Sequence, residues 1–161
     1  MTAVVDTGVF FAFYSLRDMH HYDSLGIIVH LVEGKWGRAY ITSHVLDEAL
    51  NLLKYRVSPE TCRAFLEAFV DGGVVKVIYP GEELEEAALE LFRENFSRKE
   101  ITYTDAVTVV VMRELGVKTL LSYDLRSFSG LVENIVGVNY WNSLSRRERD
   151  RILRLVDAIL R

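Results

Sequence analysis

Hydrophobic residues form short apolar runs along this chain, separated by longer segments in which they recur three and four positions apart. The short runs, which are typical of buried strands, are Thr2–Val5, Arg38–Ile41, Val74–Ile78 and Thr119–Ser122, with a fifth candidate at Ile135–Val138. Strands that alternate with helices predict a parallel sheet covered on both faces. We therefore expect an α/β fold, a three-layer α/β/α sandwich around a central parallel sheet of four to five strands.

Helix start and stop signals divide the longer segments. The expected helices cover residues 22–33, a segment opening at Thr42-Ser43, residues 59–70, 82–96 and 102–115, and a last helix after Ser145. Ser58 followed by Pro59 is a cap with proline at the first helical position. Thr102 and Asp105 have the spacing of a capping box, in which each side chain bonds the backbone N–H of the other residue.

The last helix extends the chain beyond the final expected strand. Ser145 is its expected cap, and its apolar stripe comprises Ile152, Leu155, Val156, Ile159 and Leu160. The chain contains neither an internal repeat nor a low-complexity linker. We therefore expect one domain over residues 1–161, with a core at 1–140 and a C-terminal helical extension at 141–161.

Composition narrows the class of protein. With 161 residues, 50% of them hydrophobic, the chain can bury a full core without disulfides. Its single cysteine, Cys62, excludes an internal bridge and a cysteine-rich zinc site, which favours a cytoplasmic location. The apolar stretch 9–14 is too short to span a membrane.

Four acidic residues stand beside apolar runs at widely separated positions: Asp6, Glu48, Asp105 and Asp124. Acids next to buried segments are costly unless they are solvated, paired or bound to a metal. In parallel sheets, ligands bind beyond the carboxyl ends of the strands, where all four acids could converge. Such an oxygen-only pocket suits Mg²⁺ or Mn²⁺. The net charge of −4 equals the charge of these four acids, so it does not exclude a phosphate-rich substrate once metal is bound.

Each acid also has a structural interpretation. Asp6 could cap the following helix, Asp105 is explained as the acid of a capping box, and Asp124 could be a turn residue. Glu48 lies three residues after Val45 and four before Leu52, which places it in the expected apolar stripe of its helix, where it could pair with an arginine. The hypothesis of a metal site depends on the set of four.

Other polar residues favour simpler roles. His20, His21, His30 and His44 lack the spacing of a metal-binding motif, which favours surface or core positions. The arginines of the last helix fit a solvated face better than an RNA-binding one. They are Arg146, Arg147, Arg149, Arg151 and Arg154.

With these residues in their contexts, residues 1–140 resemble PIN-domain proteins, in particular the VapC-type toxin ribonucleases and their stand-alone relatives. Asp6-Thr7 resembles the acid at the end of the first strand, and Glu48 in SHVLDEALNLL the acid of a later helix. Asp105 in TYTDAV and Asp124 in LLSYDLRSF resemble the third and fourth acids. The chain departs from the pattern at Gly8, where the family often has serine or asparagine, and at Phe128, which is one residue later than usual.

The resemblance implies a Mg²⁺- or Mn²⁺-dependent endoribonuclease, a candidate toxin of a toxin–antitoxin pair. Asp6 and Asp105 are then the first candidates for direct metal ligands, followed by Glu48. Asp124 would hold a second ion or orient the attacking water, and Thr7 and Thr104 would hydrogen-bond the ligands. Implied partners are RNA, an antitoxin protein and further copies of the chain, without a membrane. The alternative is a catalytically silent PIN-like scaffold that binds RNA or protein.

Overall fold

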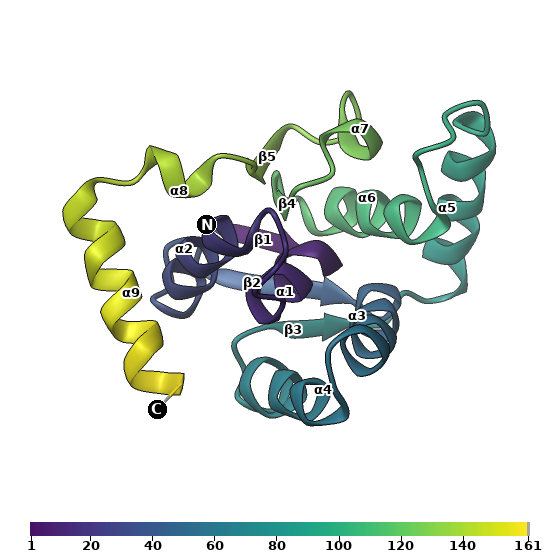
Figure 1. The fold of residues 1–161 in the computed structure, drawn as a ribbon. Helices are drawn as coiled ribbons and strands as arrows, with labels where there is room; N and C mark the ends of the chain where they lie inside the picture. Colours follow the sequence, from purple (N-terminus) through teal and green to yellow (C-terminus); the bar gives the residue numbers. More distant parts are fainter. Residues whose placement is uncertain (161) are drawn as a thin grey trace.

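The computed structural model describes residues 1–160, and its centre is a five-stranded parallel sheet (Figure 1). Its strands are β1 (Thr2–Val5), β2 (Arg38–Thr42), β3 (Lys76–Ile78), β4 (Thr119–Ser122) and β5 (Asn134–Gly137), in the spatial order β3-β2-β1-β4-β5. Val4 pairs with Tyr40 of β2 on one side and with Leu120 of β4 on the other. The first strand of the chain is therefore the central strand of the sheet.

Helices cover both faces of the sheet, which confirms the expected α/β/α class (Figure 1). One face is covered by α1 (Thr7–Tyr14), α2 (His21–Val32), α3 (Ser43–Arg56), α4 (Pro59–Phe65) and the π-helical turn η1 (Leu66–Asp71). The other face is covered by α5 (Glu82–Glu94), α6 (Tyr103–Leu115) and α7 (Leu125–Phe128).

The two hydrophobic cores meet at β1, whose side chains alternate between the faces as strand geometry requires. Ala3 and Val5 belong to the core that contains Phe10, whereas Val4 belongs to the core that contains Phe128. All five residues are fully buried. Because β1 is buried on both faces, it reads in the sequence as a continuous apolar run, as expected for a central parallel strand.

The C-terminal segment adds α8 (Tyr140–Ser143) and α9 (Arg146–Leu160), and α9 packs beside α2 (Figure 1). Of the expected stripe, Ile152 is fully buried and Val156 is partly buried, but Leu155 is 39% exposed. The side chains of Ile159 and Leu160 lie outside the described residues. Ser145 Oγ accepts a hydrogen bond from the backbone N–H of Glu148 at 3.2 Å, so the expected cap is present.

The structure differs from the sequence prediction mainly in short elements. The helix expected over residues 59–70 changes to π-helical geometry after Phe65, and the four-residue helices α7 and α8 were not predicted. Four residues are too few for a helical period to emerge from a hydrophobic pattern. No helix in the described part of the chain has the length and apolar character needed to cross a membrane.

Candidate metal centre

Two of the four acids lie just beyond the ends of the adjacent strands β1 and β4. Asp6 comes after Val5 and is the N-cap of α1, with its Oδ1 accepting a hydrogen bond from the backbone N–H of Thr7 at 2.8 Å. Asp124 comes two residues after the end of β4 and is the N-cap of α7. Because Val5 and Leu121 are register partners, both acids lie at the carboxyl edge of the sheet.

Ser122 connects these two acids. Its Oγ donates to Oδ2 of Asp6 at 2.7 Å and accepts from the backbone N–H of Asp124 at 3.0 Å. Ser127 in turn donates its backbone N–H (3.0 Å) and its Oγ (2.6 Å) to the Asp124 carboxylate. Neither serine was predicted from the sequence to belong to the site. The available signal was a hydroxyl two residues before and three residues after Asp124.

Glu48 reaches the same edge from α3. Its Oε2 accepts a hydrogen bond from Oγ1 of the buried Thr7 at 2.6 Å. Because Thr7 directly follows Asp6, this hydrogen bond links Glu48 to the start of α1. The expectation that Glu48 lies on the packed side of its helix is wrong, because the side chain is exposed. The buried stripe of α3 runs through Val45, Ala49 and Leu53, and Glu48 lies beside it.

Asp105 is the third residue of α6 and is only 8% exposed. The expected capping box is confirmed: Asp105 Oδ2 accepts from the backbone N–H of Thr102 at 2.8 Å, and Thr102 Oγ1 accepts from that of Asp105 at 3.1 Å. The neighbouring Thr104, expected to support a ligand, makes no side-chain hydrogen bond to any of the four acids within the described residues. Its place is instead beside Glu48 in a surface groove.

Electrostatic interactions connect the four acids. Burial, together with the charges of Asp105 and Glu48, raises the pKa of Asp6 from 3.8 to about 7 against the opposing hydrogen bonds of Ser122 and Thr7. Burial also raises the pKa of Asp105, and the charge of Asp124 adds to the effect. Each of the four acids therefore interacts electrostatically with at least one other acid, as a shared site requires.

This donor set fits a hard divalent cation. Within the described residues, none of the four acids forms an ion pair with a lysine, arginine or histidine. Their charges are thus balanced only in part, by hydroxyl and backbone N–H donors. Carboxylate oxygens without a protein cation are the ligands that Mg²⁺ and Mn²⁺ prefer. Asp6, Glu48, Asp105 and Asp124 are therefore the residues that could hold such an ion.

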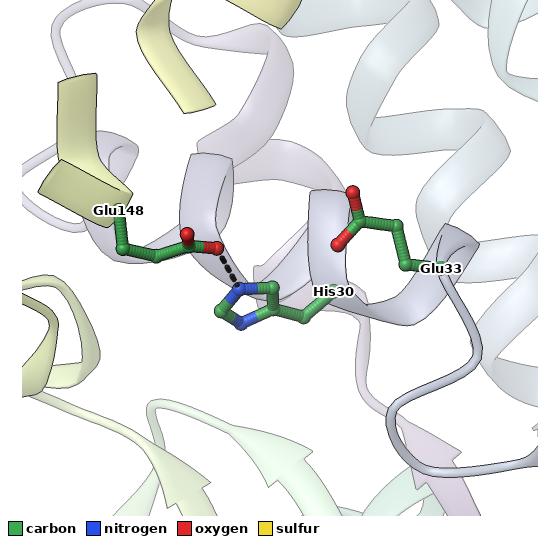
Figure 2. A group of neighbouring side chains, drawn as sticks. All are labelled: His30, Glu33 and Glu148. Atoms are coloured by element: carbon green, nitrogen blue, oxygen red, sulfur yellow. Dashed lines mark hydrogen bonds and ion pairs between the residues drawn. The ribbon is translucent and has the colours of Figure 1, made fainter. Parts of the chain in front are cut away.

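The most compact set of possible ligands in the described residues lies elsewhere, between α2 and α9. Figure 2 shows His30, Glu33 and Glu148, whose ligand atoms all lie within 4.8 Å of one another. The four acids at the sheet edge do not meet that spacing. A wider spacing is compatible with Mg²⁺, which usually keeps several waters and takes only one or two protein carboxylates directly.

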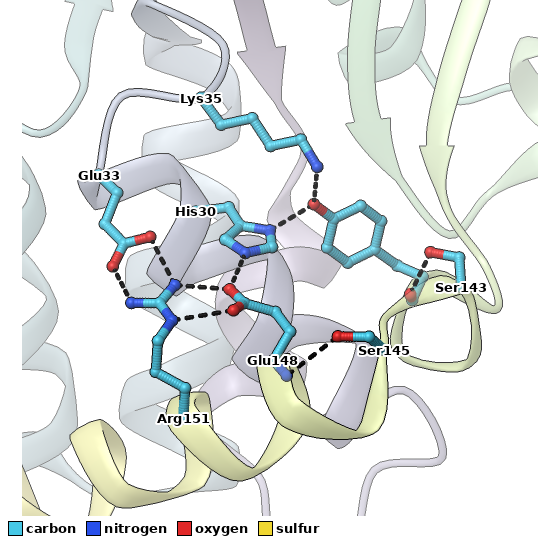
Figure 3. A network of polar contacts seen from close by, with 8 residues as sticks. His30, Glu33, Lys35, Ser143, Ser145, Glu148 and Arg151 are labelled. Atoms are coloured by element: carbon cyan, nitrogen blue, oxygen red, sulfur yellow. Dashed lines mark hydrogen bonds and ion pairs between the residues drawn. The ribbon is translucent and has the colours of Figure 1, made fainter.

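Arg151 already supplies the cation of the cluster between α2 and α9 (Figure 3). Its guanidinium bonds Glu33 at 2.6 and 2.9 Å and Glu148 at 2.5 and 2.9 Å. His30 bonds Oε1 of Glu148 through Nε2 at 2.8 Å and Oη of Tyr140 through Nδ1 at 2.5 Å. Hydrogen bonds from Arg151 and His30 lower the pKa of Glu148 to about 2. We interpret this cluster as a set of contacts that attaches α9 to α2. Arg151 occupies the position that a metal ion would need.

Three comparisons with known proteins identify the family to which this fold belongs. The model of the PIN domain family matches residues 3–134. The chain is 51% identical to a VapC ribonuclease of Archaeoglobus fulgidus over 161 residues, which is all of this chain and 96% of that one.

A similar solved structure is the crystal structure of VapC20 of Mycobacterium tuberculosis, described as a toxin that cleaves the sarcin–ricin loop. It has a TM-score of 0.69 and 28% identity, and the match covers 81% of this chain and 97% of that one. The resemblance found in the sequence is confirmed: this chain belongs to the PIN-domain family.

Proposed function

We propose that this chain is a divalent-metal-dependent endoribonuclease that hydrolyses phosphodiester bonds in RNA, with Asp6, Glu48, Asp105 and Asp124 as its metal-binding and catalytic residues. One observation carries the assignment of the site. Four carboxylates without a cationic partner among the described residues interact electrostatically at the carboxyl edge of the sheet, and two of them have raised pKa values. The ribonuclease relative and the toxin-like solved structure support the choice of RNA.

The four acids fit different roles because their surroundings differ. Asp6 and Asp105 are the least solvated of the four, which suits them for direct contact with an ion. Glu48, oriented by Thr7, is the next candidate. Asp124 is exposed and held from both sides by serines, which suits a second ion or an attacking water. When bound, Mg²⁺ or Mn²⁺ would supply Lewis-acid stabilisation of the phosphate and lower the pKa of water.

Hydrogen-bond donors around the acids keep them aligned. The hydroxyls of Ser122 and Thr7 donate to carboxylate oxygens, so they fix the carboxylates' rotation while leaving other lone pairs available. Outer hydrogen bonds of this kind commonly contribute 10- to 100-fold to metal affinity. The pKa of Asp6 near 7 also means that a proton competes with the cation at neutral pH, so metal binding should strengthen as the pH rises.

A cleavage assay tests the proposal. Single-stranded RNA should be cut in the presence of Mn²⁺, and EDTA should stop the reaction. Asp6→Asn should abolish cleavage while the far-ultraviolet circular dichroism stays unchanged. Asp71→Asn, at an exposed acid at the end of η1, is the matched control and should cut normally.

The rival function is that of a catalytically silent scaffold. Full activity of Asp6→Asn, or cleavage that persists in EDTA, would refute the metal-dependent mechanism. Absence of cleavage across varied RNAs, combined with RNA binding by the wild-type protein, would favour the scaffold.

We extend the proposal to cellular context. We infer a cytoplasmic protein of one domain, with residues 141–161 as an extension, that pairs with an antitoxin and associates with copies of itself. The toxin description of the VapC20 structure supports the antitoxin. Co-expression with the protein encoded by a neighbouring reading frame, followed by measurement of the mass of the complex in solution, tests both associations.

A further inference from the structure

The exposed side of α3 carries a groove that begins at the proposed metal site. It has a volume of about 500 Å³, and its lining includes Glu48, His44, Asn51, Tyr55, Arg56 and Thr104. Residues 44, 48, 51 and 55 follow one another at steps of three and four, which places them along one face of the helix. Glu48 thus belongs both to the acid cluster and to the groove, so the groove is continuous with the site.

At the near end, His44 is fixed by residues of two other helices. Its Nε2 bonds Oε1 of Glu85 at 2.7 Å, and Glu85 also accepts a hydrogen bond from the hydroxyl of Tyr103. The Tyr103 ring meets the His44 ring edge to face, with centroids 5.5 Å apart. Nδ1 of His44 makes no hydrogen bond within the described residues. A held imidazole with one available nitrogen, one helical turn from Glu48, is well placed to contact a ligand.

At the far end, the groove offers an aromatic ring and a cation. Tyr55 is 80% exposed, and Arg56 lies in the basic last turn of α3 with Lys54. Tyr55 is seven residues after Glu48, or about 10 Å along the helix. Between them, Asn51 donates to Asp47 at 3.1 Å, which leaves its amide oxygen as a hydrogen-bond acceptor.

We propose that this groove holds the single-stranded RNA next to the cleaved phosphate, with Tyr55 stacking on an unpaired base and Arg56 contacting a phosphate. The inference rests on the proposed function and adds the substrate's path to it. Aromatic rings for stacking, a cation for the backbone and polar groups for base edges are the features that single-stranded RNA sites combine. The order of charges also fits: the carboxylates of Asp47 and Glu48 lie at one end of the groove, and the guanidinium of Arg56 lies at the other.

Binding measurements test the groove separately from catalysis. Labelled single-stranded RNA is titrated with protein in Mn²⁺, in the Asp105→Asn background, so that the strand is not cut. Adding Tyr55→Ala should raise Kd about 5- to 150-fold, since stacking on one base contributes roughly 1–3 kcal/mol. Tyr55→Phe keeps the ring and should bind normally. Phe96→Ala removes a comparably exposed aromatic ring outside the groove and is the control.

The salt dependence tests Arg56. Arg56→Gln should reduce the slope of log Kd against log salt concentration by about 0.7, the value for one phosphate contact with a single strand. Arg113→Gln makes the same change of charge at an exposed site near the end of α6 and should leave the slope unchanged. In the cleaving protein, Tyr55→Ala should raise KM with little change in kcat.

The outcomes separate the two proposals. If the wild-type protein cuts RNA but both groove variants bind like their controls, the groove inference is overturned and the nuclease stands. If the wild-type protein does not cut RNA but binding depends on Tyr55 and Arg56, the groove stands and the nuclease falls. If Tyr55→Ala lowers the mass of the protein in solution and leaves RNA binding unchanged, this face of α3 is a contact between copies of the chain, which also overturns the inference.

Discussion

Replacing Asp6 by asparagine should stabilise the metal-free protein while it abolishes metal-dependent activity. Burial and the neighbouring acids raise the pKa of Asp6 from 3.8 to about 7, so ionisation of this side chain opposes folding. This rise in pKa corresponds to roughly 4 kcal/mol of lost unfolding free energy at a pH above 7. Asparagine carries no charge but accepts fewer hydrogen bonds from Thr7 and Ser122, so we expect a net gain of about 1–3 kcal/mol.

The stability of the wild-type protein should fall as the pH rises. Well below pH 3.8, Asp6 is protonated both in the folded protein and in the unfolded chain, so the full stability is present. Stability is then lost as the pH rises from about 4 to 7, because the unfolded chain ionises more readily. The advantage of Asp6→Asn should therefore be small at pH 4 and greatest above pH 7.

Urea unfolding in EDTA at pH 4.5 and pH 8 measures the free energy of unfolding of the wild type and of Asp6→Asn. The control, Asp71→Asn, should show no comparable change between the two pH values because the residue is exposed. Adding Mn²⁺ should reverse the order of stability, since an ion at 100 times its Kd stabilises the wild type by about 3 kcal/mol and the variant much less. If Asp6→Asn were no more stable than the wild type at pH 8 in EDTA, the argument from burial and repulsion would be refuted.

Three further changes probe the surroundings of the site. Thr7→Val removes the donor to Glu48 and should weaken Mn²⁺ binding about 10- to 100-fold in calorimetry, whereas unchanged affinity would exclude an orienting role. Gly137→Ala places a Cβ 2.0 Å from the carbonyl oxygen of Ser122. The free energy of unfolding in urea should therefore fall by about 1–3 kcal/mol, and cleavage should slow. Wild-type stability together with wild-type cleavage would contradict this prediction. Arg151→Met should speed hydrogen exchange in α9 without changing cleavage. Unaltered exchange would show that these ion pairs do not hold α9 against α2.

The fold could be predicted from the sequence because its signals are local. The central strands are apolar on both faces, and the helices after Ser58 and Thr102 begin at residues whose side chains cap them in the structure. The prediction failed where a local pattern was ambiguous. Glu48 falls between Val45 and Leu52 in the sequence, but the buried stripe of α3 passes through Ala49, which leaves Glu48 exposed.

The arrangement of the site depends on contacts that no local pattern contains. The acids could be listed from the sequence, but their connection through Ser122 joins positions 116 residues apart, and that of Thr7 with Glu48 joins positions 41 residues apart. These links arise from the pairing of β1 with β4 and from the start of α3 beside β2. The cluster of His30 with Glu33 and Glu148 was missed for the same reason, since α9 brings Glu148 to α2.

The caps explain the shape of the acidic edge but not its charge. Asp6 and Asp124 are N-caps, and Asp105 completes a capping box. Asparagine or serine caps a helix about as well as aspartate, and neither would carry the cost of ionisation that Asp6 bears. Glu48 caps nothing, yet it extends the same edge. Four unneutralised acids are thus more charge than the fold requires, and a bound cation is the simplest physical reason for keeping them together.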